Sequence, residues 1–205
     1  MDPVVVLRAA ALTVAAFFIG GIPWGVIVAR VSGGPDPRTI GSGRTGGANV
    51  MRAVGPRLAL VSGLLDMLKG TAAVLLARIL GAGVEVEVLA GLAAIVGHSR
   101  SPFLGFSGGR GVSAAFGAAL VLAPLASAII LAVFIGVLAV SRYTSLASLV
   151  GAAVGGVALA VQVTATGLPP VLLVFAIGGA ALIWLFHLDN IGRLLRGEER
   201  KFGAK

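Results

Sequence analysis

The interpretation of this chain depends on Val112–Val140, which reads VSAAFGAALVLAPLASAIILAVFIGVLAV. These 29 residues carry no charge, and Pro124 lies near their centre. A membrane-spanning helix takes about 20 apolar residues, so the stretch is too long for one straight span and too short for two full ones. It therefore either crosses a membrane once or folds at Pro124 as a hairpin of two short helices.

The composition of the whole chain indicates a membrane setting. Of its 205 residues, 58% are hydrophobic and 12% are charged, whereas soluble domains have about 25% charged residues. There is no cysteine, which excludes a disulfide scaffold, a thiolate metal site and a cysteine nucleophile. We therefore predict an all-α, polytopic helical membrane protein with a single domain over residues 1–205. An ordinary cytosolic enzyme, a disordered chain and a coiled coil are excluded.

Several other stretches have the apolar character of spans. Those of sufficient length are Val4–Ala29, Leu58–Leu80, Leu146–Val163 and Leu168–Leu188. Val86–Gly97 has only 12 residues, about 18 Å of helix, which is short of the roughly 30 Å hydrocarbon core.

The basic residues decide between the possible topologies. One cluster of five lies between Arg30 and Arg57, and another between Arg193 and Lys205. Cytoplasmic loops are enriched in Lys and Arg, so both clusters belong on one face. A five-span scheme achieves this if Val86–Gly97 does not cross and Val112–Val140 crosses once. A seven-span scheme achieves it with the hairpin, and it places 13 of the 16 basic residues inside. We expect seven transmembrane helices, some short, with the N-terminus out and the C-terminus in.

Four polar clusters fall on the inner face in the seven-span scheme. They are residues 41–52 (GSGRTGGANVMR), 97–111 (GHSRSPFLGFSGGRG), 141–148 (SRYTSLAS) and 187–193 (HLDNIGR). Glycine-rich backbone can close around an oxyanion, and the helix expected after Gly111 favours an anion at its start. The first cluster is not a Walker A loop, because no Gly-Lys-Ser/Thr follows. Each cluster alone could be a solvated loop or an interfacial anchor, but together they predict a phosphate site.

Two charges interrupt the second apolar stretch. Asp66 and Lys69 are three residues apart, a spacing that permits pairing on one helix face. An unpaired charge near the bilayer centre costs roughly 2.5–3.5 kcal/mol or more. The two residues either neutralise each other as a structural pair, or they brace the glycine-rich loop or line its cavity.

Taken in order, the motifs resemble the bacterial acyl-phosphate-dependent glycerol-3-phosphate acyltransferase family. They are IPWG (22–25), GSG (41–43), LDMLKG (65–70), GH (97–98), GGRGV (108–112), RYTSL (142–146) and His187 with Asn190 and Ile191. The resemblance covers essentially the whole chain.

The resemblance implies a multi-pass enzyme of the bacterial inner membrane, with its active site on the cytoplasmic face. It would transfer a fatty acyl group from acyl phosphate to the 1-hydroxyl of sn-glycerol 3-phosphate, giving lysophosphatidic acid and phosphate for phospholipid synthesis. No cofactor or metal is implied. The implied partners are the two substrates, membrane lipids and a soluble enzyme that makes acyl phosphate. Nucleic acid is disfavoured as a partner, because the basic residues lie between apolar spans.

The site assignments combine residue chemistry with the resemblance. Acyl phosphate has a good leaving group, so the site needs to hold two phosphorylated molecules and stabilise an oxyanion rather than supply a covalent nucleophile. The catalytic candidates are Ser42, Arg52, Arg110 and His187. The substrate-binding candidates are Gly43, Gly47, Asn49, His98, Gly108, Gly109, Ser145, Ser148 and Asn190. The general base is either His187 or a phosphate of the substrate.

The chain also departs from the family pattern. The family usually has Asn at Arg44, Ala-Thr at Gly47-Ala48, and Lys at Arg110 and Gly192. These departures leave open a divergent paralogue with another acceptor. A membrane transporter of a phosphorylated or anionic solute is the alternative class, although it would more often place polar groups at the midplane on broken helices.

Overall fold

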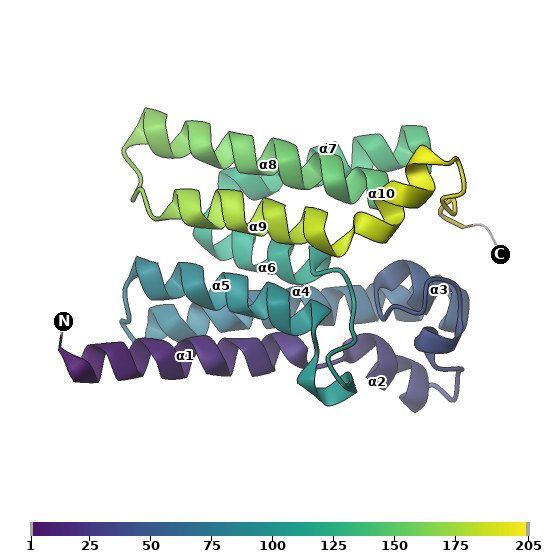
Figure 1. The fold of residues 1–205 in the computed structure, drawn as a ribbon, viewed down its shortest axis with the longest axis horizontal. Helices are drawn as coiled ribbons and strands as arrows, with labels where there is room; N and C mark the ends of the chain where they lie inside the picture. Colours follow the sequence, from purple (N-terminus) through teal and green to yellow (C-terminus); the bar gives the residue numbers. More distant parts are fainter. Residues whose placement is uncertain (1, 204–205) are drawn as a thin grey trace.

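The computed structural model describes residues 2–203, and its regular elements in that range are helices. The long helices lie side by side along one axis of the molecule (Figure 1). They are α1 (Pro3–Gly21), α4 (Pro56–Ile79), α5 (Val84–Ser99), α7 (Pro124–Ser141), α8 (Thr144–Thr166) and α9 (Leu172–Phe186). The shorter ones are α2 (Trp24–Val31), α3 (Gly47–Val54), α6 (Val112–Leu122) and α10 (Leu188–Leu195), with 3₁₀ turns η1 (Pro37–Thr39) and η2 (Pro102–Leu104).

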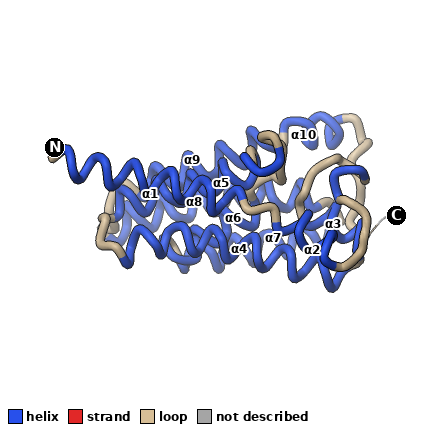
Figure 2. Tube along the Cα trace, turned by 90° about the horizontal axis from the view of Figure 1, so that it is seen from below, coloured by secondary structure: helices blue, strands red, loops and turns tan. Residues whose placement is uncertain are grey.

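The two ends of the bundle differ in character. The N-terminus lies at one end, and α2, α3, α10 and the C-terminal segment lie at the other (Figures 1 and 2). We call this second end the polar end, because the four polar clusters of the sequence meet there. By length and composition, the spans Pro3–Val31, Pro56–Ile79, Pro124–Ser141 and Thr144–Thr166 could cross a membrane, and α9 with α10 adds a fifth if this pair, bent by 61°, counts as one. The prediction of an all-helical polytopic membrane protein is confirmed.

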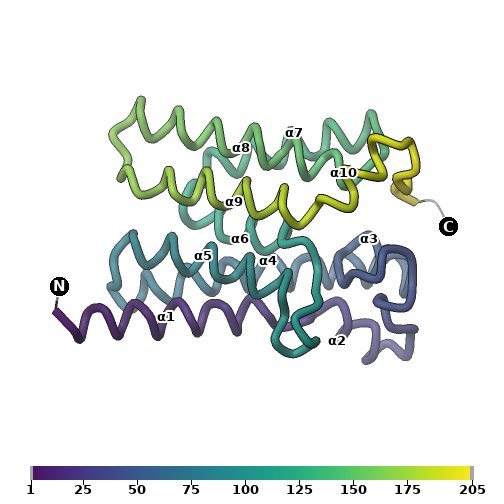
Figure 3. The backbone as a smooth tube through the Cα atoms, in the orientation of Figure 1, coloured from purple at the N-terminus to yellow at the C-terminus, as the bar shows by residue number. Residues whose placement is uncertain are grey.

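The stretch Val112–Val140 folds as two helices rather than one. Ala123 leaves the helical region (φ −151°, ψ 70°), and Pro124 begins α7, a position where its missing N–H costs nothing. Figure 3 shows that the chain reverses between α6 and α7. In α7 only Ala126 and Ser127 are buried. This helix has 18 residues and is apolar on average, so it is long enough to face lipid.

The first apolar stretch also differs from the expected continuous span. The helix stops at Gly21, and Ile22 has a non-helical ψ of 119° before Pro23. Proline disfavours the α conformation in the residue before it, so the break is a local consequence of the sequence. The Ile22 carbonyl, which loses its helical partner, accepts a hydrogen bond of 2.8 Å from Lys69 Nζ.

Glycines bring helix pairs into backbone contact. A Cβ on Gly97 of α5 would overlap the Phe17 carbonyl oxygen of α1, and one on Gly117 of α6 would overlap the Met67 carbonyl oxygen of α4. Small residues permit this close approach. In a membrane the hydrophobic effect does not drive helices together, so helices associate through such close packing. These contacts fix α5 against α1 and α6 against α4, next to the polar end.

Candidate functional site

A cavity of about 480 Å³ opens at the polar end, and we call it the polar cavity. Parts of all four polar clusters line it, together with α4 and the C-terminal segment. The predicted site residues that line it are Ser42, Gly47, Asn49, Arg52, His98, Arg110, Ser145, Ser148, His187 and Asn190. Gly43, Gly108 and Gly109 are not among its lining residues. The structure therefore brings together clusters that are spread from residue 42 to residue 190 of the sequence.

Asn49 organises the first glycine-rich loop. Its Nδ2 donates to the carbonyls of Ile40 (2.8 Å) and Arg44 (3.0 Å), while its Oδ1 accepts from the Ser42 N–H (3.4 Å) and Arg52 Nη1 (3.1 Å). The side chain is buried, and its amide group is already engaged by the protein. Asn49 thus shapes the loop and aims Arg52, whereas contact with a substrate stays a prediction.

The cations of the cavity lie close enough to affect one another. Burial lowers the pKa of the Arg44 guanidinium, and the charge of Arg110 lowers it further. Burial and the charge of Arg200 likewise lower the pKa of Arg52. Each guanidinium stays protonated near neutral pH, since arginine starts from a pKa above 12. An anion placed among them would relieve their repulsion, so this wall of the cavity suits a phosphate.

A buried ion pair forms the floor of the cavity. Lys69 Nζ lies 2.8 Å from Asp66 Oδ1, and His98 Nδ1 lies 3.5 Å from the same oxygen. Of the two alternatives for these charges, the structural pair is confirmed, and Asp66 but not Lys69 also lines the cavity. His98 is thereby joined to α4 and connects the floor to the second glycine-rich loop.

Gly108 and Gly109 pack against His98. A Cβ on Gly109 would overlap the imidazole, and one on Gly108 would overlap the His98 carbonyl oxygen. The Gly109 N–H donates to that carbonyl over 3.1 Å, so it is not the free donor expected of an anion nest. Because the two glycines have no side chain, the loop can instead pack closely over His98. This packing places Arg110 at the cavity.

Arg110 is held by a carboxylate. Its Nη1 and Nη2 donate to Asp189 Oδ1 (2.6 Å) and Oδ2 (2.9 Å), and Nη1 also donates to the Phe186 carbonyl (3.0 Å). Burial alone raises the pKa of the Asp189 carboxyl, but hydrogen bonds from Arg110 and Arg193 hold it well below its usual range. Arg110 therefore ties the second loop to α10, and a bound phosphate would share this guanidinium with Asp189.

His187 lies where α9 bends into α10 and is almost fully buried. Its Nδ1 lies 2.7 Å from the Ile183 carbonyl oxygen. A carbonyl only accepts, so Nδ1 carries the proton and Nε2 of the neutral ring is left as an acceptor. This is the arrangement that a general base requires.

Glu199 enters the polar cavity from the C-terminal segment. Its carboxylate accepts hydrogen bonds from Ser145 Oγ (2.9 Å), Asn190 Nδ2 (2.6 Å) and Arg193 Nε (2.7 Å). Sequence reasoning missed this residue, because a glutamate within the terminal charged run GEERK (197–201) resembles solvated surface. No motif or spacing in the chain signals its role.

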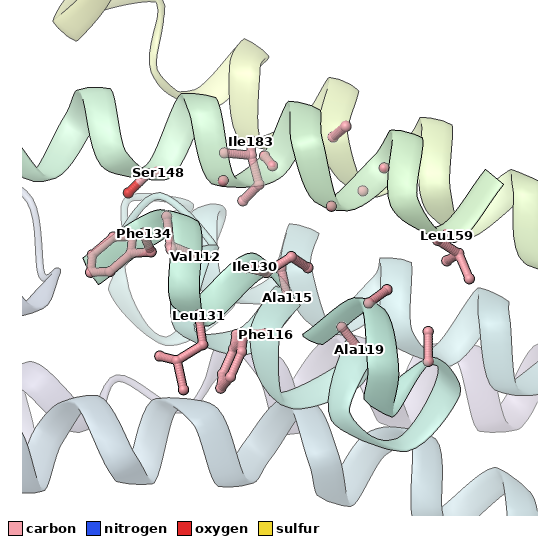
Figure 4. A pocket seen from close by; sticks show the side chains of 18 of the residues that line it. Val112, Ala115, Phe116, Ala119, Ile130, Leu131, Phe134, Ser148, Leu159 and Ile183 are labelled. Carbon is pink, nitrogen blue, oxygen red and sulfur yellow. The ribbon is translucent and has the colours of Figure 1, made fainter. Parts of the chain in front are cut away.

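A second, apolar cavity of about 220 Å³ lies among α4, α6, α7, α8 and α9. Figure 4 shows Phe116, Ile130, Leu131, Leu159 and Ile183 around it. Both cavities are lined by Val112, Ser113, Phe134 and Ser148, so they adjoin. The combined space fits an amphiphile with an anionic head and an apolar tail. Among the described residues, no three His, Asp or Glu side chains cluster as metal ligands.

Comparisons with known proteins agree with this chemistry. The family model for glycerol-3-phosphate acyltransferase matches residues 10–197. The glycerol-3-phosphate acyltransferase of Rubrobacter xylanophilus is 45% identical over 195 residues, covering 95% of each chain. That of Sinorhizobium fredii is 42% identical, covering 92% of this chain and 90% of its own.

Two solved structures have the same fold. Both are of PlsY, an integral membrane glycerol 3-phosphate acyltransferase. The glycerol 3-phosphate form superposes with a TM-score of 0.86 at 35% identity, and the lysophosphatidic acid form with 0.85 at 34%; each comparison covers 96% of both chains. Family model, relatives and fold agree over nearly the whole length, and the chain belongs to the integral membrane glycerol-3-phosphate acyltransferase family.

Proposed function

We propose that this protein transfers a fatty acyl group from acyl phosphate to the 1-hydroxyl of sn-glycerol 3-phosphate, forming lysophosphatidic acid and inorganic phosphate. The observation that carries the proposal is the junction of the two cavities, where a cationic site and an apolar site share four lining residues. Family membership and the glycerol 3-phosphate form of PlsY support the acceptor. The sequence resemblance supports acyl phosphate as the donor. Its good leaving group also supports it, because direct transfer from acyl phosphate needs no covalent nucleophile.

The reaction is a direct acyl transfer. The acceptor hydroxyl oxygen attacks the acyl carbonyl carbon, the bond from that carbon to the phosphate oxygen breaks, and its electron pair leaves with phosphate. The hydroxyl proton passes to His187 Nε2 or to a phosphate oxygen. Holding both substrates in one cavity supplies proximity, and nearby cations stabilise the charge that develops on the oxygens.

We assign the phosphates to the cationic wall. Arg44 and Arg52 have no carboxylate hydrogen-bonded to them among the described residues, whereas Arg110 is shared with Asp189. Ser42, beside Arg44, would add a hydroxyl donor. Asn49 supports the site by holding the loop in shape, because its amide is already engaged.

The acyl chain occupies the apolar cavity. Its carboxyl end then lies at the junction near Ser148, beside the polar cavity. The chain would arrive laterally from the bilayer, and a soluble enzyme that makes acyl phosphate would supply the donor at the membrane surface.

The assay uses purified protein with palmitoyl phosphate and glycerol 3-phosphate, and it measures phosphate release together with lysophosphatidic acid. We expect turnover with acyl phosphate and none with acyl-CoA, and Arg52→Ala should lose at least tenfold in kcat/KM. Robust turnover of acyl-CoA would exclude the assigned donor. A transporter would form no lysophosphatidic acid, and a paralogue with another acceptor would release phosphate only with that acceptor.

We also propose that α1 and each helix from α4 to α9 cross or enter the inner membrane of a bacterium, with the N-terminus out and the polar end in the cytoplasm. Without native cysteines, single substitutions can report the topology. An impermeant maleimide on intact cells should label Val84→Cys and Thr166→Cys but not Ser107→Cys. Labelling of Ser107→Cys together with Val84→Cys would support the five-span scheme, and labelling of Ser107→Cys without Val84→Cys would indicate the opposite orientation.

A further inference from the structure

The chain after α10 folds back over the polar cavity as a strap, Gly197–Phe202. The strap is tied on both sides of Glu199. Before it, the Glu198 N–H donates to the Arg193 carbonyl over 2.8 Å; after it, the Phe202 N–H donates to the Arg142 carbonyl over 2.6 Å. Arg142 Nη2 returns a bond of 3.3 Å to the Phe202 carbonyl. The strap is therefore part of the cavity wall rather than a loose tail.

The Glu199 carboxylate links helices that are distant in sequence. Its side chain is 7% exposed and accepts from Ser145 of α8 and from Asn190 and Arg193 of α10. One carboxylate thus fixes the conformations of three side chains, each of which lines the polar cavity. Charge-assisted hydrogen bonds are about twice as strong as neutral ones, so the arrangement is well held.

The position of this group points to the acceptor rather than the donor. Ser145, Asn190, Arg193 and Glu199 line the polar cavity but not the apolar one. Ser148, one helical turn beyond Ser145, lines both and marks the junction. The wall held by Glu199 therefore lies beside the reacting carbonyl, outside the path of the acyl chain.

The charge of Glu199 also bears on how the acceptor is oriented. Its carboxylate neutralises Arg193 over 2.7 Å, so this wall presents hydroxyl and amide groups rather than a free cation. Asn190 lines this wall beside Ser145, and its Nδ2 is held by the Glu199 carboxylate. The phosphate of the acceptor is left to Arg44 and Arg52, which line the same cavity.

We propose that Glu199 is a positioning residue for the acyl acceptor, and the proposal rests on the function proposed above. It holds Ser145 and Asn190 to receive the hydroxyl end of glycerol 3-phosphate and directs the phosphate end to the arginines of the first loop. Glu199 touches neither reacting atom, so its effect falls on acceptor binding.

The test compares Glu199→Gln with Glu198→Gln. Both remove one negative charge from the strap, but Glu198 is exposed and pairs only with Arg196 among the described residues. In Glu199→Gln, the Nε2 donor group meets the Ser145 and Asn190 donors or the Arg193 donor, so the wall loses its order. We expect KM for glycerol 3-phosphate to rise roughly ten- to a hundredfold. KM for acyl phosphate and the unfolding midpoint should match those of Glu198→Gln.

In the comparison of the two variants, three results would overturn the proposal: equal kinetics, a lower KM for glycerol 3-phosphate in Glu199→Gln, or a rise of both KM values together with a loss of stability. A lower KM would mark Glu199 as an internal competitor for the phosphate. Thermal stabilisation by glycerol 3-phosphate without donor provides an independent measurement. If wild type turns over no acyl phosphate, the proposed function fails, and a smaller stabilisation of Glu199→Gln than of Glu198→Gln still supports the positioning role. No stabilisation of the wild type would overturn it.

Discussion

At the scale of single residues, the site depends on cations held by neighbours that sequence motifs do not reveal. Arg52 is aimed by Asn49, and Arg110 is held by Asp189 through two hydrogen bonds. A motif identifies the charged residue, but its partner determines where the charge points and how much of it a substrate can use. This question matters most for Arg110, which can either bind the substrate phosphate directly or only anchor α10.

Arg110→Ala should lower kcat/KM by roughly ten- to a hundredfold, since it removes a hydrogen-bonding cation from a buried phosphate site. Arg110→Lys should retain part of the activity, because the charge stays but the planar fork is lost. Arg100→Ala, in the same loop, should cost less than tenfold. Steady-state kinetics measure all three.

Asp189→Asn separates the two roles of Arg110. If Arg110 binds phosphate, freeing its guanidinium should leave kcat/KM within tenfold of wild type. An Asp189→Asn variant as impaired as Arg110→Ala would show that the pair only anchors α10.

The proton acceptor can be identified at His187. Its Nδ1–H is committed to the Ile183 carbonyl, which leaves Nε2 for the acceptor hydroxyl. His187→Gln should lower kcat by about 10²–10⁴-fold, the usual contribution of a general base, with KM for acyl phosphate little changed. A loss below tenfold would assign the proton to a substrate phosphate.

At the scale of elements, helix breaks and helix contacts place the loops. The break before Pro23 frees a carbonyl, and Lys69 satisfies it while pairing with Asp66. The charges that interrupt α4 therefore join α1, α4 and, through His98, α5. Gly97 of α5 and Gly117 of α6 also fix the helices, because they let α5 approach α1 and α6 approach α4.

Lys69→Met should destabilise the protein by about 3–5 kcal/mol, because it leaves the Asp66 carboxylate buried without its cation. The double variant Asp66→Asn/Lys69→Met should recover part of this loss. Arg196→Met, which breaks an exposed pair, should change stability by less than about 1 kcal/mol. Unfolding in detergent provides the measurement, and additive effects of the two buried changes would contradict the pairing.

Gly117→Ala tests the contact between α4 and α6. The added methyl group would meet the Met67 backbone, which cannot move away as a side chain can. Overpacking of this kind costs about 1–3 kcal/mol, so the unfolding midpoint should fall. Gly136→Ala, where a Cβ meets nothing within 4 Å, is the matched control and should leave the midpoint unchanged or higher.

At the scale of the whole molecule, the polar cavity and the apolar cavity adjoin and share four lining residues. The arginines that line the polar cavity belong to the end of the molecule where the C-terminal segment lies (Figure 1), and the apolar cavity adjoins it among α4, α6, α7, α8 and α9. This arrangement lets one site hold a water-soluble acceptor and a membrane-soluble donor. The depth of the apolar cavity should therefore set the length of the acyl chain.

Gly151→Leu should shift the enzyme toward shorter acyl phosphates. Gly151 lines the apolar cavity, and its nearest neighbours to an added Cβ are 3.7 Å or more away, so a larger side chain can project into the space. Burial of each methylene contributes about 0.8 kcal/mol, and exclusion of two would lower kcat/KM for the longer donor about tenfold. Gly136→Leu, at an exposed position, should leave the ratio of 12- to 16-carbon donors unchanged; an unchanged ratio in Gly151→Leu would place the acyl chain elsewhere.

The sequence by itself determined the features that local chemistry dictates. Apolar composition predicts the helical membrane class, Pro124 together with the distribution of basic residues predicts the hairpin, and the spacing of Asp66 and Lys69 permits their pairing. The glycine-rich clusters and the arginines predict a phosphate site, because few other residue types bind that group.

The tertiary structure alone decided which groups meet. The pairing of Arg110 with Asp189 joins segments that are 79 residues apart. The hydrogen bond from Ser145 to Glu199 joins segments that are 54 residues apart. Helix packing sets such contacts, and no local spacing encodes them. The same reason explains Gly109, whose smallness serves the His98 ring rather than an anion. A residue's type limits the chemistry available to it, whereas its neighbours in the folded chain determine which part of that chemistry is used.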